Sequence, residues 1–463
     1  MNKGEKGVLM FTKFQKGGEM DRPHTFTVLL LPITFSLLSG QGPDTLWTRA
    51  YGGDSVDLAY SVQQTTDGGY IAVGYTRSFG LGGSDIWLLK LYANGDTAWT
   101  RLIGGIYDDE GRDVEQTSDG GYIITGFIDT MADWGKLCLI KTDANGITTW
   151  IKQYRTPDGP AEGYAVEQTT DGGYIVTGKA GHTAPSGSDY IWLLKTDANG
   201  DTIWCREWGY PEWSSWGADV QETRDGGYIL TGTIVLPSTY YYNDISLIKT
   251  NSSGGAGWTR TYGDSAVNDY GYSVEESPFG GHIAVGQRSG NGYILRTDAN
   301  GDSLWARIYG GSEYRSVSIT ADSGYIITGC RNYNLYLIRM DESGDTLWVK
   351  EYGGVNTDGG YSVEQTTDDG YIIGGFTYSY GAGSSDVYLV KTEPEPGIVE
   401  MLGNSLKQIY GSTIISGPLR LPEGKECRVF DVSGREMRPD RVRPGIYFIE
   451  VEGKITQKVV KIQ

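Results

Sequence analysis

The chain alternates apolar and polar positions in short runs, and short polar turns separate these runs. In the first clear unit, residues 60–65 read YSVQQT and residues 70–76 read YIAVGYT, with a DGG turn between them. Residues 85–91 (DIWLLKL) and 97–103 (TAWTRLI) follow, joined by an ANGD turn. Alternation with a period of two predicts strands, and Asp-Gly or Asn-Gly between two such runs predicts a hairpin. The unit is therefore predicted to be four short antiparallel strands.

This four-strand unit repeats along the chain. The motif DGGYI, or a variant of it, starts at positions 67, 119, 171, 225, 279, 322 and 368. Four strands every 43–54 residues predict the blades of a β-propeller, whereas a parallel β-helix, the runner-up, has shorter coils and no such regular turns. A tryptophan also recurs in the fourth strand of each unit: Trp47, Trp99, Trp150, Trp204, Trp258, Trp305 and Trp348.

The two ends of the repeat region complement each other. The region starts with a lone fourth strand, DTLWTRAY at 44–51, and ends with a third strand, DVYLVKT at 386–392. The N-terminal strand is therefore predicted to complete the last blade, which leaves no open sheet edge in the ring. We predict an all-β fold, a seven-bladed propeller over residues 43–392 that its N-terminal strand closes.

The recurring tryptophans are predicted to pack between neighbouring blades, because one strand position repeats in every unit. The turn KTDANGDTIW at 195–204 resembles the Trp-docking repeat of quinoprotein propellers and the Asp-box of sialidases. It departs from the Asp-box, since two residues, not one, separate Asp197 from Gly200. Both motifs are structural in those families, so the resemblance implies a propeller and no activity.

The two kinds of connection predict two different faces. The turns between the first and second strands and between the third and fourth strands are short and repeated, and a propeller places both on one face. The other loops vary and lie on the opposite face, where a rigid scaffold usually carries function. Any binding site is expected on this variable-loop face or in its central funnel.

Two loops of the fourth unit are unusually aromatic. They cover residues 207–219 and 233–244. Exposed aromatic side chains suit sugar rings or peptide segments, and the alternative is a local cluster that pins two long loops. The candidate ligand-binding residues are Trp208, Tyr210, Trp213, Trp216, Tyr240, Tyr241 and Tyr242.

Acidic residues recur at the start of the first strand, at Asp57, Asp109, Asp269 and Asp358. They suit either calcium, which prefers oxygen ligands, or loops in which Asp accepts hydrogen bonds from nearby backbone amides. We favour the second interpretation, leave calcium binding open and expect no cofactor. No catalytic motif is present, so no catalytic residue is assigned. A hydrolase or lyase that uses paired funnel carboxylates stays open as an alternative.

Composition narrows the partners. The 463 residues include 69 Gly, 12% aromatic residues and three His, and the net charge is −19. This charge disfavours nucleic acid and anionic membranes as partners. The four cysteines form no CxxC pair and are expected to be free thiols.

The first 42 residues predict a leader. An apolar run, FTVLLLPITFSLL at 26–38, follows basic residues and precedes small ones, as in a signal peptide. The run is too short to span a bilayer, and no later segment predicts a transmembrane helix. The stretch before it is long, so Met20 is an alternative start.

The repeat stops at a linker over residues 393–397, and residues 398–463 have a different pattern. Hairpins are predicted at 427–437 and 445–463, and together with earlier strands near Ile414 and Leu419 they suggest a small β-sandwich.

The stretch VFDVSGREM and the ending RPGIYFIEVEGKITQKVVKIQ resemble the C-terminal sorting domain of type IX (Por) secretion substrates. The resemblance covers about the last 40 residues. It implies that residues 398–463 engage the outer-membrane secretion machinery, and that the protein is secreted or attached to the outer cell surface. An ordinary accessory sandwich is the alternative.

Together these features predict a secreted or cell-surface propeller that binds carbohydrate or protein. A polysaccharide-acting enzyme and a surface scaffold without a ligand are the competing hypotheses.

Overall fold

The described part of the chain is built from strands alone. The structure is a computed structural model of the chain, and it places 33 strands in seven four-stranded sheets and one five-stranded sheet. No helix within the described residues is long and apolar enough to cross a bilayer. The described residues are 42–130, 133–156, 159–182, 187–236, 242–263, 267–310, 312–395, 413–416, 427–431, 436–438, 445–451 and 454–462.

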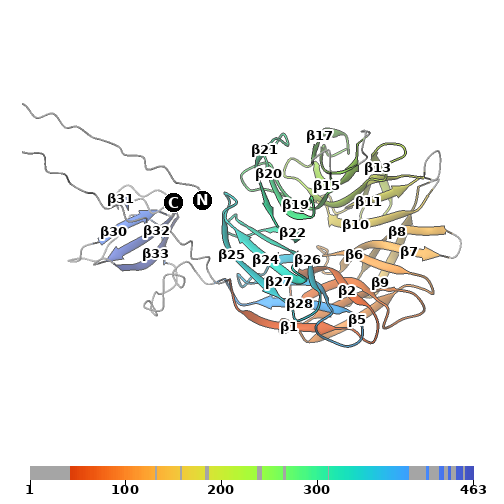
Figure 1. Ribbon diagram of the computed structural model, residues 1–463, viewed down its shortest axis with the longest axis horizontal. Coiled ribbons are helices and arrows are strands. Elements are labelled where there is room, and N and C mark those ends of the chain that lie inside the picture. The colour runs from red at the N-terminus through yellow and green to blue at the C-terminus, as the bar shows by residue number, and fades with distance from the viewer. Residues whose placement is uncertain are drawn as a thin grey trace, which may run out of the picture. The chain divides into compact units, whose positions relative to one another are not determined.

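The seven four-stranded sheets are the blades of a propeller, as predicted. Each blade is antiparallel, and its first strand packs against the first strands of both neighbouring blades, which closes a ring around a central channel. Figure 1 shows these innermost strands nearest the middle of the ring. In blade order they are β2 (Asp57–Gln64), β6 (Asp109–Gln116), β10 (Ala161–Gln168), β14 (Trp216–Glu222), β18 (Asp269–Glu276), β22 (Ser312–Ile319) and β26 (Asp358–Gln365).

The two middle strands of each blade form the core. They are apolar along most of their length because both of their faces pack against neighbouring blades; all seven residues of β4 are buried. The second strands are β3 (Tyr70–Thr76), β7 (Tyr122–Thr130), β11 (Tyr174–Gly181), β15 (Tyr228–Val235), β19 (His282–Arg288), β23 (Tyr325–Arg331) and β27 (Tyr371–Thr377). The third strands are β4 (Asp85–Leu91), β8 (Asp133–Thr142), β12 (Asp189–Thr196), β16 (Asn243–Thr250), β20 (Asn291–Thr297), β24 (Asn334–Met340) and β28 (Asp386–Thr392).

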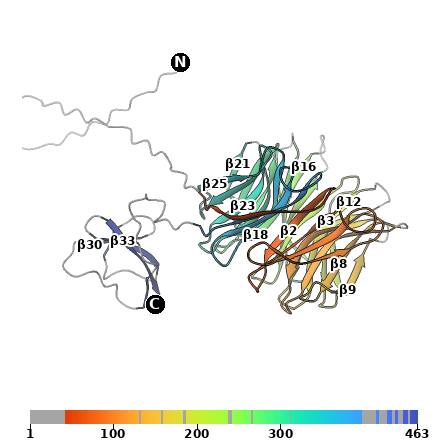
Figure 2. The ribbon, with the colours of Figure 1, turned by 90° about the horizontal axis from the view of Figure 1, so that it is seen from below.

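The outermost strands carry the recurring tryptophans and complete the ring. They are β5 (Thr97–Ile103), β9 (Thr148–Tyr154), β13 (Thr202–Trp208), β17 (Ala256–Tyr262), β21 (Ser303–Tyr309), β25 (Thr346–Tyr352) and β1 (Thr45–Tyr51). β1 belongs to the seventh blade, where it pairs antiparallel with β28 from Thr45↔Thr392 to Tyr51↔Val387. Figures 1 and 2 both show the red β1 beside the blue β28. The predicted closure by the N-terminal strand is confirmed.

Each recurring tryptophan docks onto the next blade. The Trp99 ring meets Tyr122, the first residue of the next second strand, at 6.0 Å between centroids. Its outer edge covers Gly146, whose positive φ of 72° and lack of a side chain make room for the indole. The tryptophans are therefore packing residues, as predicted. The equivalent pairs are Trp47–Tyr70, Trp150–Tyr174, Trp204–Tyr228, Trp258–His282, Trp305–Tyr325 and Trp348–Tyr371.

A buried cation holds most of the DGG turns, which the sequence analysis did not predict. In blade 1 the amine of Lys90 lies 3.0 Å from Asp67. Partial burial tends to raise the pKa of Asp67, but hydrogen bonds from Thr65, Gly69 and Lys90 outweigh it and lower that pKa to about 2. The other such pairs are Lys141–Asp119, Lys195–Asp171, Lys249–Asp225, Arg339–Asp322 and Lys391–Asp368.

Glu393 and Glu395, which lie in the predicted linker over residues 393–397, bond to residues of the propeller, and the bounds of the linker stay a prediction. The backbone N–H of Glu393 donates to the carbonyl of Asp44 at 2.7 Å. The carboxylate of Glu395 accepts from the Trp348 indole at 2.7 Å and from the Tyr371 hydroxyl at 2.6 Å. Blade 7 has no turn between its third and fourth strands, because the two ends of the propeller segment, β28 and β1, meet there. Glu395 provides the last tryptophan with a polar partner at this point.

The C-terminal segment forms one mixed sheet with the strand order β29-β33-β32-β30-β31. Both predicted hairpins are present, as the antiparallel pairs β30 with β31 and β32 with β33. The strand near Ile414 is β29, which runs parallel to β33. Only this one sheet lies within the described residues, and Leu419 lies outside them, so the sandwich stays a prediction. The strands are β29 (Thr413–Ser416), β30 (Cys427–Asp431), β31 (Glu436–Met437), β32 (Gly445–Val451) and β33 (Lys454–Ile462).

Candidate functional site

Every innermost strand has a bulge that turns one extra side chain into the channel. In β2, Ala59 pairs with Gly74 and Ser61 with Val73, so Tyr60 has no residue opposite it. The other six innermost strands skip the equivalent residue. Bulges re-aim side chains in this way. We call the seven bulge residues the collar: Tyr60, Arg112, Tyr164, Ala218, Tyr272, Arg315 and Tyr361.

The collar holds two Tyr-Arg-Tyr groups, one in blades 1–3 and one in blades 5–7. In the first, the guanidinium of Arg112 lies over the Tyr60 ring at 4.2 Å and 5.7 Å from the Tyr164 ring centre. Glu110, two residues earlier on the same strand, pairs with Arg112 at 2.7 Å. Cation–π contact and an ion pair together fix this side chain in the channel.

The second group repeats the first with different partners. Arg315 lies 4.0 Å from the Tyr272 ring centre and 5.6 Å from that of Tyr361. Glu313 accepts from its Nε at 3.1 Å and from its Nη2 at 2.9 Å, a bidentate pair that fixes the plane of the guanidinium. Tyr60 and Tyr361 meet at 5.4 Å, so the two groups join between blades 7 and 1.

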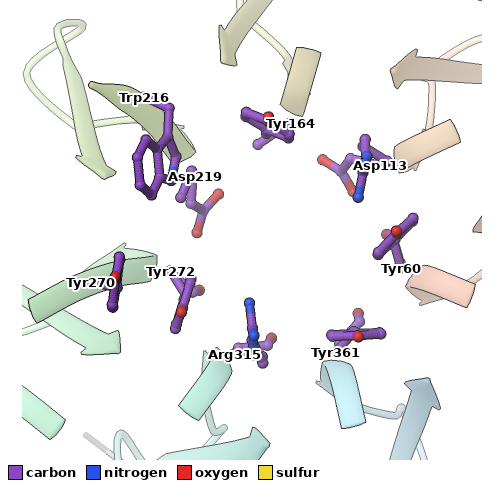
Figure 3. Close-up of a pocket in the computed structure, with 16 residues that line it drawn as sticks. Tyr60, Asp113, Tyr164, Trp216, Asp219, Tyr270, Tyr272, Arg315 and Tyr361 are labelled. Atoms are coloured by element: carbon purple, nitrogen blue, oxygen red, sulfur yellow. The ribbon is translucent and has the colours of Figure 1, made fainter. Parts of the chain in front are cut away.

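Blade 4 breaks the collar. Ala218 stands where the other blades have Tyr or Arg, and Trp216 lies two residues earlier, at the start of β14. The Trp216 ring stacks with Tyr270 of blade 5 (6.1 Å, 25°), and Tyr270 is nearly parallel to Tyr272 (6.4 Å, 10°). This makes a wall of three aromatic rings beside a gap. Figure 3 shows the wall and the rest of the collar around an open centre.

The collar surrounds a cavity of about 470 Å³, which we call the mouth cavity. The innermost strands begin on the variable-loop face, and the cavity is lined by residues between the first and the fifth position of these seven- or eight-residue strands. The cavity therefore opens on the face where the sequence analysis expected a site. Its lining consists of the collar with Ser61, Asp113, Ala165, Trp216, Asp219, Tyr270, Ser273, Ser316 and Ser362.

Two carboxyl groups lie at the floor of the mouth cavity, Asp113 and Asp219. Each accepts backbone N–H bonds from its own strand and from the next blade; Asp219 accepts from Val220 at 2.8 Å and from Val274 at 2.9 Å. Burial raises the pKa of Asp219 to about 6 and also raises that of Asp113. The two acids join blades while still facing the cavity.

Below the floor, a second ring of side chains joins neighbouring blades. Its seven members, the lower ring, are Gln63, Glu115, Glu167, Gln221, Glu275, Ser318 and Glu364. Six of them accept a backbone N–H from the next blade; Glu364 accepts from Gln64 at 2.6 Å and Gln63 from Gln116 at 2.8 Å. Burial raises the pKa of Glu115 and Glu364 to about 7.

Burial likewise raises the pKa of Glu167 and Glu275 to about 8. Because an unperturbed Glu titrates near 4.3, all four lower-ring carboxyls keep a larger protonated fraction near neutral pH. Of the described residues, no group of three or more His, Cys, Asp or Glu has the geometry to hold a metal ion.

The predicted aromatic loop of blade 4 is divided by the structure. Trp216 lines the mouth cavity. Trp208 lies at the end of β13, where it packs against the core cluster that includes Ile191. Tyr210 and Trp213 form a small antiparallel bridge, and Tyr210 is 39% exposed. The loop therefore contributes one cavity residue, one packing residue and a bridged pair outside the cavity lining.

The facing loop adds less. Tyr242 is described and partly buried, and it lies just before β16. Tyr240 and Tyr241 lie outside the described residues, so their role as site residues stays a prediction.

The acidic residues at the strand starts make loop hydrogen bonds. Asp57 is fully buried and accepts from the backbone N–H of Gly53 at 2.9 Å and from the Ser78 hydroxyl at 2.6 Å. Asp358 does the same with Gly354 and Ser379, both at 2.8 Å. This is the loop chemistry that the sequence analysis favoured over calcium.

The collar was missed from the sequence, and so was a second exposed surface. Seven large apolar side chains are at least 45% exposed on the variable loops of blades 6, 7 and 1. A shallow cavity of about 720 Å³ lies among some of them. These side chains are Tyr333, Val355, Tyr378, Tyr380, Phe79, Leu81 and Ile106.

Similarity to known proteins is confined to solved structures at low sequence identity. No protein family and no curated protein matches the chain. Among solved structures, a catalytically inactive variant of virginiamycin B lyase from Staphylococcus aureus, with quinupristin, is 12% identical over 74% of this chain and 99% of its own, with a TM-score of 0.48. The Dos1 propeller is 12% identical over 76% of this chain and 95% of its own (TM-score 0.47). YCF48 bound to D1 peptide is 11% identical over 76% and 99% (TM-score 0.44).

Proposed function

We propose that the propeller is a binding module that takes carbohydrate or protein at the mouth of its channel, on the variable-loop face. The break in the collar at blade 4 carries this proposal. Ala218 opens the ring where six other blades narrow it, and the aromatic wall of Trp216, Tyr270 and Tyr272 borders the opening. An apolar wall with a few convergent polar groups is typical of ligand sites.

The ligand contacts are proposed to extend from the cavity to the blade-4 loop. Trp216 is the inner contact, and Tyr210 and Trp213 lie on the same loop, outside the cavity lining. Tyr240, Tyr241 and Tyr242 on the facing loop are the outer candidates. Trp208 supports the loop from below, since it packs into the core.

Arrays of glycans and of peptides, probed with the full chain, test the proposal. Trp216→Ala should reduce binding at least tenfold. Tyr92→Ala, at an exposed tyrosine of the turn face, is the matched control and should leave binding unchanged. Equal loss in both variants, or no ligand on either array, would contradict the proposed function.

A hydrolase or lyase is the second candidate, because Asp113 and Asp219 lie in the mouth cavity and the pKa of Asp219 is raised by burial to about 6. Binding is favoured over catalysis, since each of these carboxyls already accepts backbone N–H bonds that join blades. Release of reducing ends from a polysaccharide, lost in Asp219→Asn, would establish the enzyme.

We also propose that the protein is exported by residues 1–42 and delivered to the outer surface, or released, through residues 398–463. The support is the sequence resemblance of the C-terminal segment to type IX sorting domains. In a host with that secretion system, deletion of residues 446–463 should hold the protein in the periplasm. Normal surface delivery of the truncated chain would contradict this.

A further inference from the structure

The charges of the collar cancel within single strands. Arg112 is paired with Glu110 and Arg315 with Glu313, at 2.7 and 2.9 Å, and all four side chains are less than a third exposed. At the collar, a charged group of a ligand therefore meets an ion pair and not a free ion. The overall charge of −19 further disfavours polyanions.

The collar nevertheless keeps hydrogen-bonding groups for a ligand. The bonds of Arg315 to Glu313 use Nε and Nη2, and within the described residues Nη1 has no protein partner. The hydroxyls of Tyr272 and Tyr361 also lack a partner there, and none of these atoms is sealed from solvent. Asp219, which lies beside Trp216 in the cavity lining (Figure 3), supplies carboxyl oxygens. Hydroxyl groups match such a mixture because each one both donates and accepts.

The aromatic wall favours a ligand that has a flat apolar face. Trp216 stacks with Tyr270, and the amide of Asn243 donates to the Tyr270 hydroxyl at 3.2 Å, which helps to hold that ring in place. The C–H face of a pyranose is apolar and flat, while its rim carries hydroxyls. A nucleobase would also stack, but its phosphates would face the negative charge of the chain.

We infer that the mouth cavity binds an uncharged sugar residue of a glycan, stacked on Trp216 and Tyr270 and hydrogen-bonded by Arg315 and Asp219. The volume of about 470 Å³ lies in the range of small-ligand pockets, about 300–1,000 Å³. The inference rests on the proposed binding function and names the ligand class of the same site.

The chain itself supplies the test substitution. Ala218→Tyr restores the residue that stands at this bulge in blades 1, 3, 5 and 7, so the fold should accept it while the gap closes. The full chain and this variant are titrated with neutral, amine-bearing and carboxylate-bearing oligosaccharides and with peptides from the array. The expected result is binding of neutral sugars, weakened at least tenfold by Ala218→Tyr, with an unchanged melting temperature. Tyr92→Ala, at the exposed tyrosine of the turn face, is the control and should change the affinity less than threefold. Trp213→Ala, outside the cavity lining, tests the contribution of the blade-4 loop.

Other results overturn the inference in distinguishable ways. Binding only of charged sugars would exclude the neutral ligand, and peptide binding that Ala218→Tyr blocks would keep the site and replace the ligand class. Sugar binding that is lost in Trp213→Ala but kept in Ala218→Tyr would show that the sugar binds at the blade-4 loop and not in the mouth cavity. No binding of either class would remove the proposed function as well.

Discussion

The collar and the lower ring lie on the same seven strands, yet they differ in regularity. Six of the seven lower-ring positions make the same bond, from a side-chain oxygen to a backbone N–H of the next blade. The collar alternates Tyr and Arg around most of the ring and then opens at Ala218. Positions that join blades are uniform, whereas the positions that shape the cavity vary. The variation therefore indicates where the ring departs from a purely structural design.

One irregularity in the joining positions supports this interpretation. In six of the seven blades, the residue after the lower-ring position accepts a backbone N–H from the previous blade; Gln116, for example, accepts from Thr66 at 2.8 Å. In blade 6 the acceptor position is occupied by Ile319, whose side chain has no acceptor atom. In blade 5 the donor position, which corresponds to Thr66 in blade 1, is occupied by Pro278, which has no N–H. Acceptor and donor are absent together, so no donor is left unsatisfied.

The largest expected effect is a pH dependence of the lower ring. Burial raises the pKa of its four Glu residues to about 7 or 8, so the folded state holds extra protons above the unfolded pKa near 4.3. The free energy of unfolding is therefore highest below about pH 4.3, where these Glu residues are protonated in both states. It falls as the pH rises to about 8, because the folded state must then give up its extra protons. Denaturant unfolding should show lower stability at pH 8 than at pH 5, by on the order of 3 kcal/mol for each of the four Glu residues. Equal stability at both values would contradict the raised pKa values.

A matched pair of substitutions at Glu275 separates its charge from its hydrogen bond. Glu275→Gln should keep the bond to Ile319, as Gln63 and Gln221 keep theirs, and should weaken the pH dependence. Glu275→Leu leaves that N–H without an acceptor and should cost about 1–3 kcal/mol at pH 5. Equal stability of the two variants at pH 5 would show that the bond contributes nothing.

The collar should show the opposite balance, with a larger effect on ligand than on stability. Arg315→Lys keeps a positive charge beside Glu313 but loses the planar, bidentate contact and the stacking on Tyr272. We expect at least a tenfold loss of glycan affinity by calorimetry and a stability change below about 1 kcal/mol. A large loss of stability with unchanged affinity would make the collar a structural ring like the lower one.

The smallest effect tests the missing bond between blades 5 and 6. Ile319→Gln and Pro278→Thr should each change stability little, because each alone creates only half of a bond. Together they should show a favourable coupling of about 0.5–1.5 kcal/mol in a double-mutant cycle. Strict additivity would contradict the pairing of these two positions.

The sequence predicted the blades, the closure and the docking tryptophans because their signals are local or strictly periodic. It did not predict the collar, because Tyr60 and Arg112 gain their common position only from a bulge in the strand pairing. It also could not separate Trp208 from Trp216. Both lie in one aromatic segment of the sequence. The structure shows that Trp208 ends β13 and packs against the core, whereas Trp216 begins β14 and therefore lines the channel.

The closure of the ring has a mechanical consequence. The chain enters at Gly42 and leaves at Glu395, and these points lie together because Glu393 bonds to Asp44. A pulling force between segments attached to the two ends would load the β1–β28 ladder from one end, so that its bonds break one after another and not all together. Both attachment points are on the turn face, opposite the mouth cavity. A load on the ends would therefore open blade 7 from the side opposite the mouth cavity.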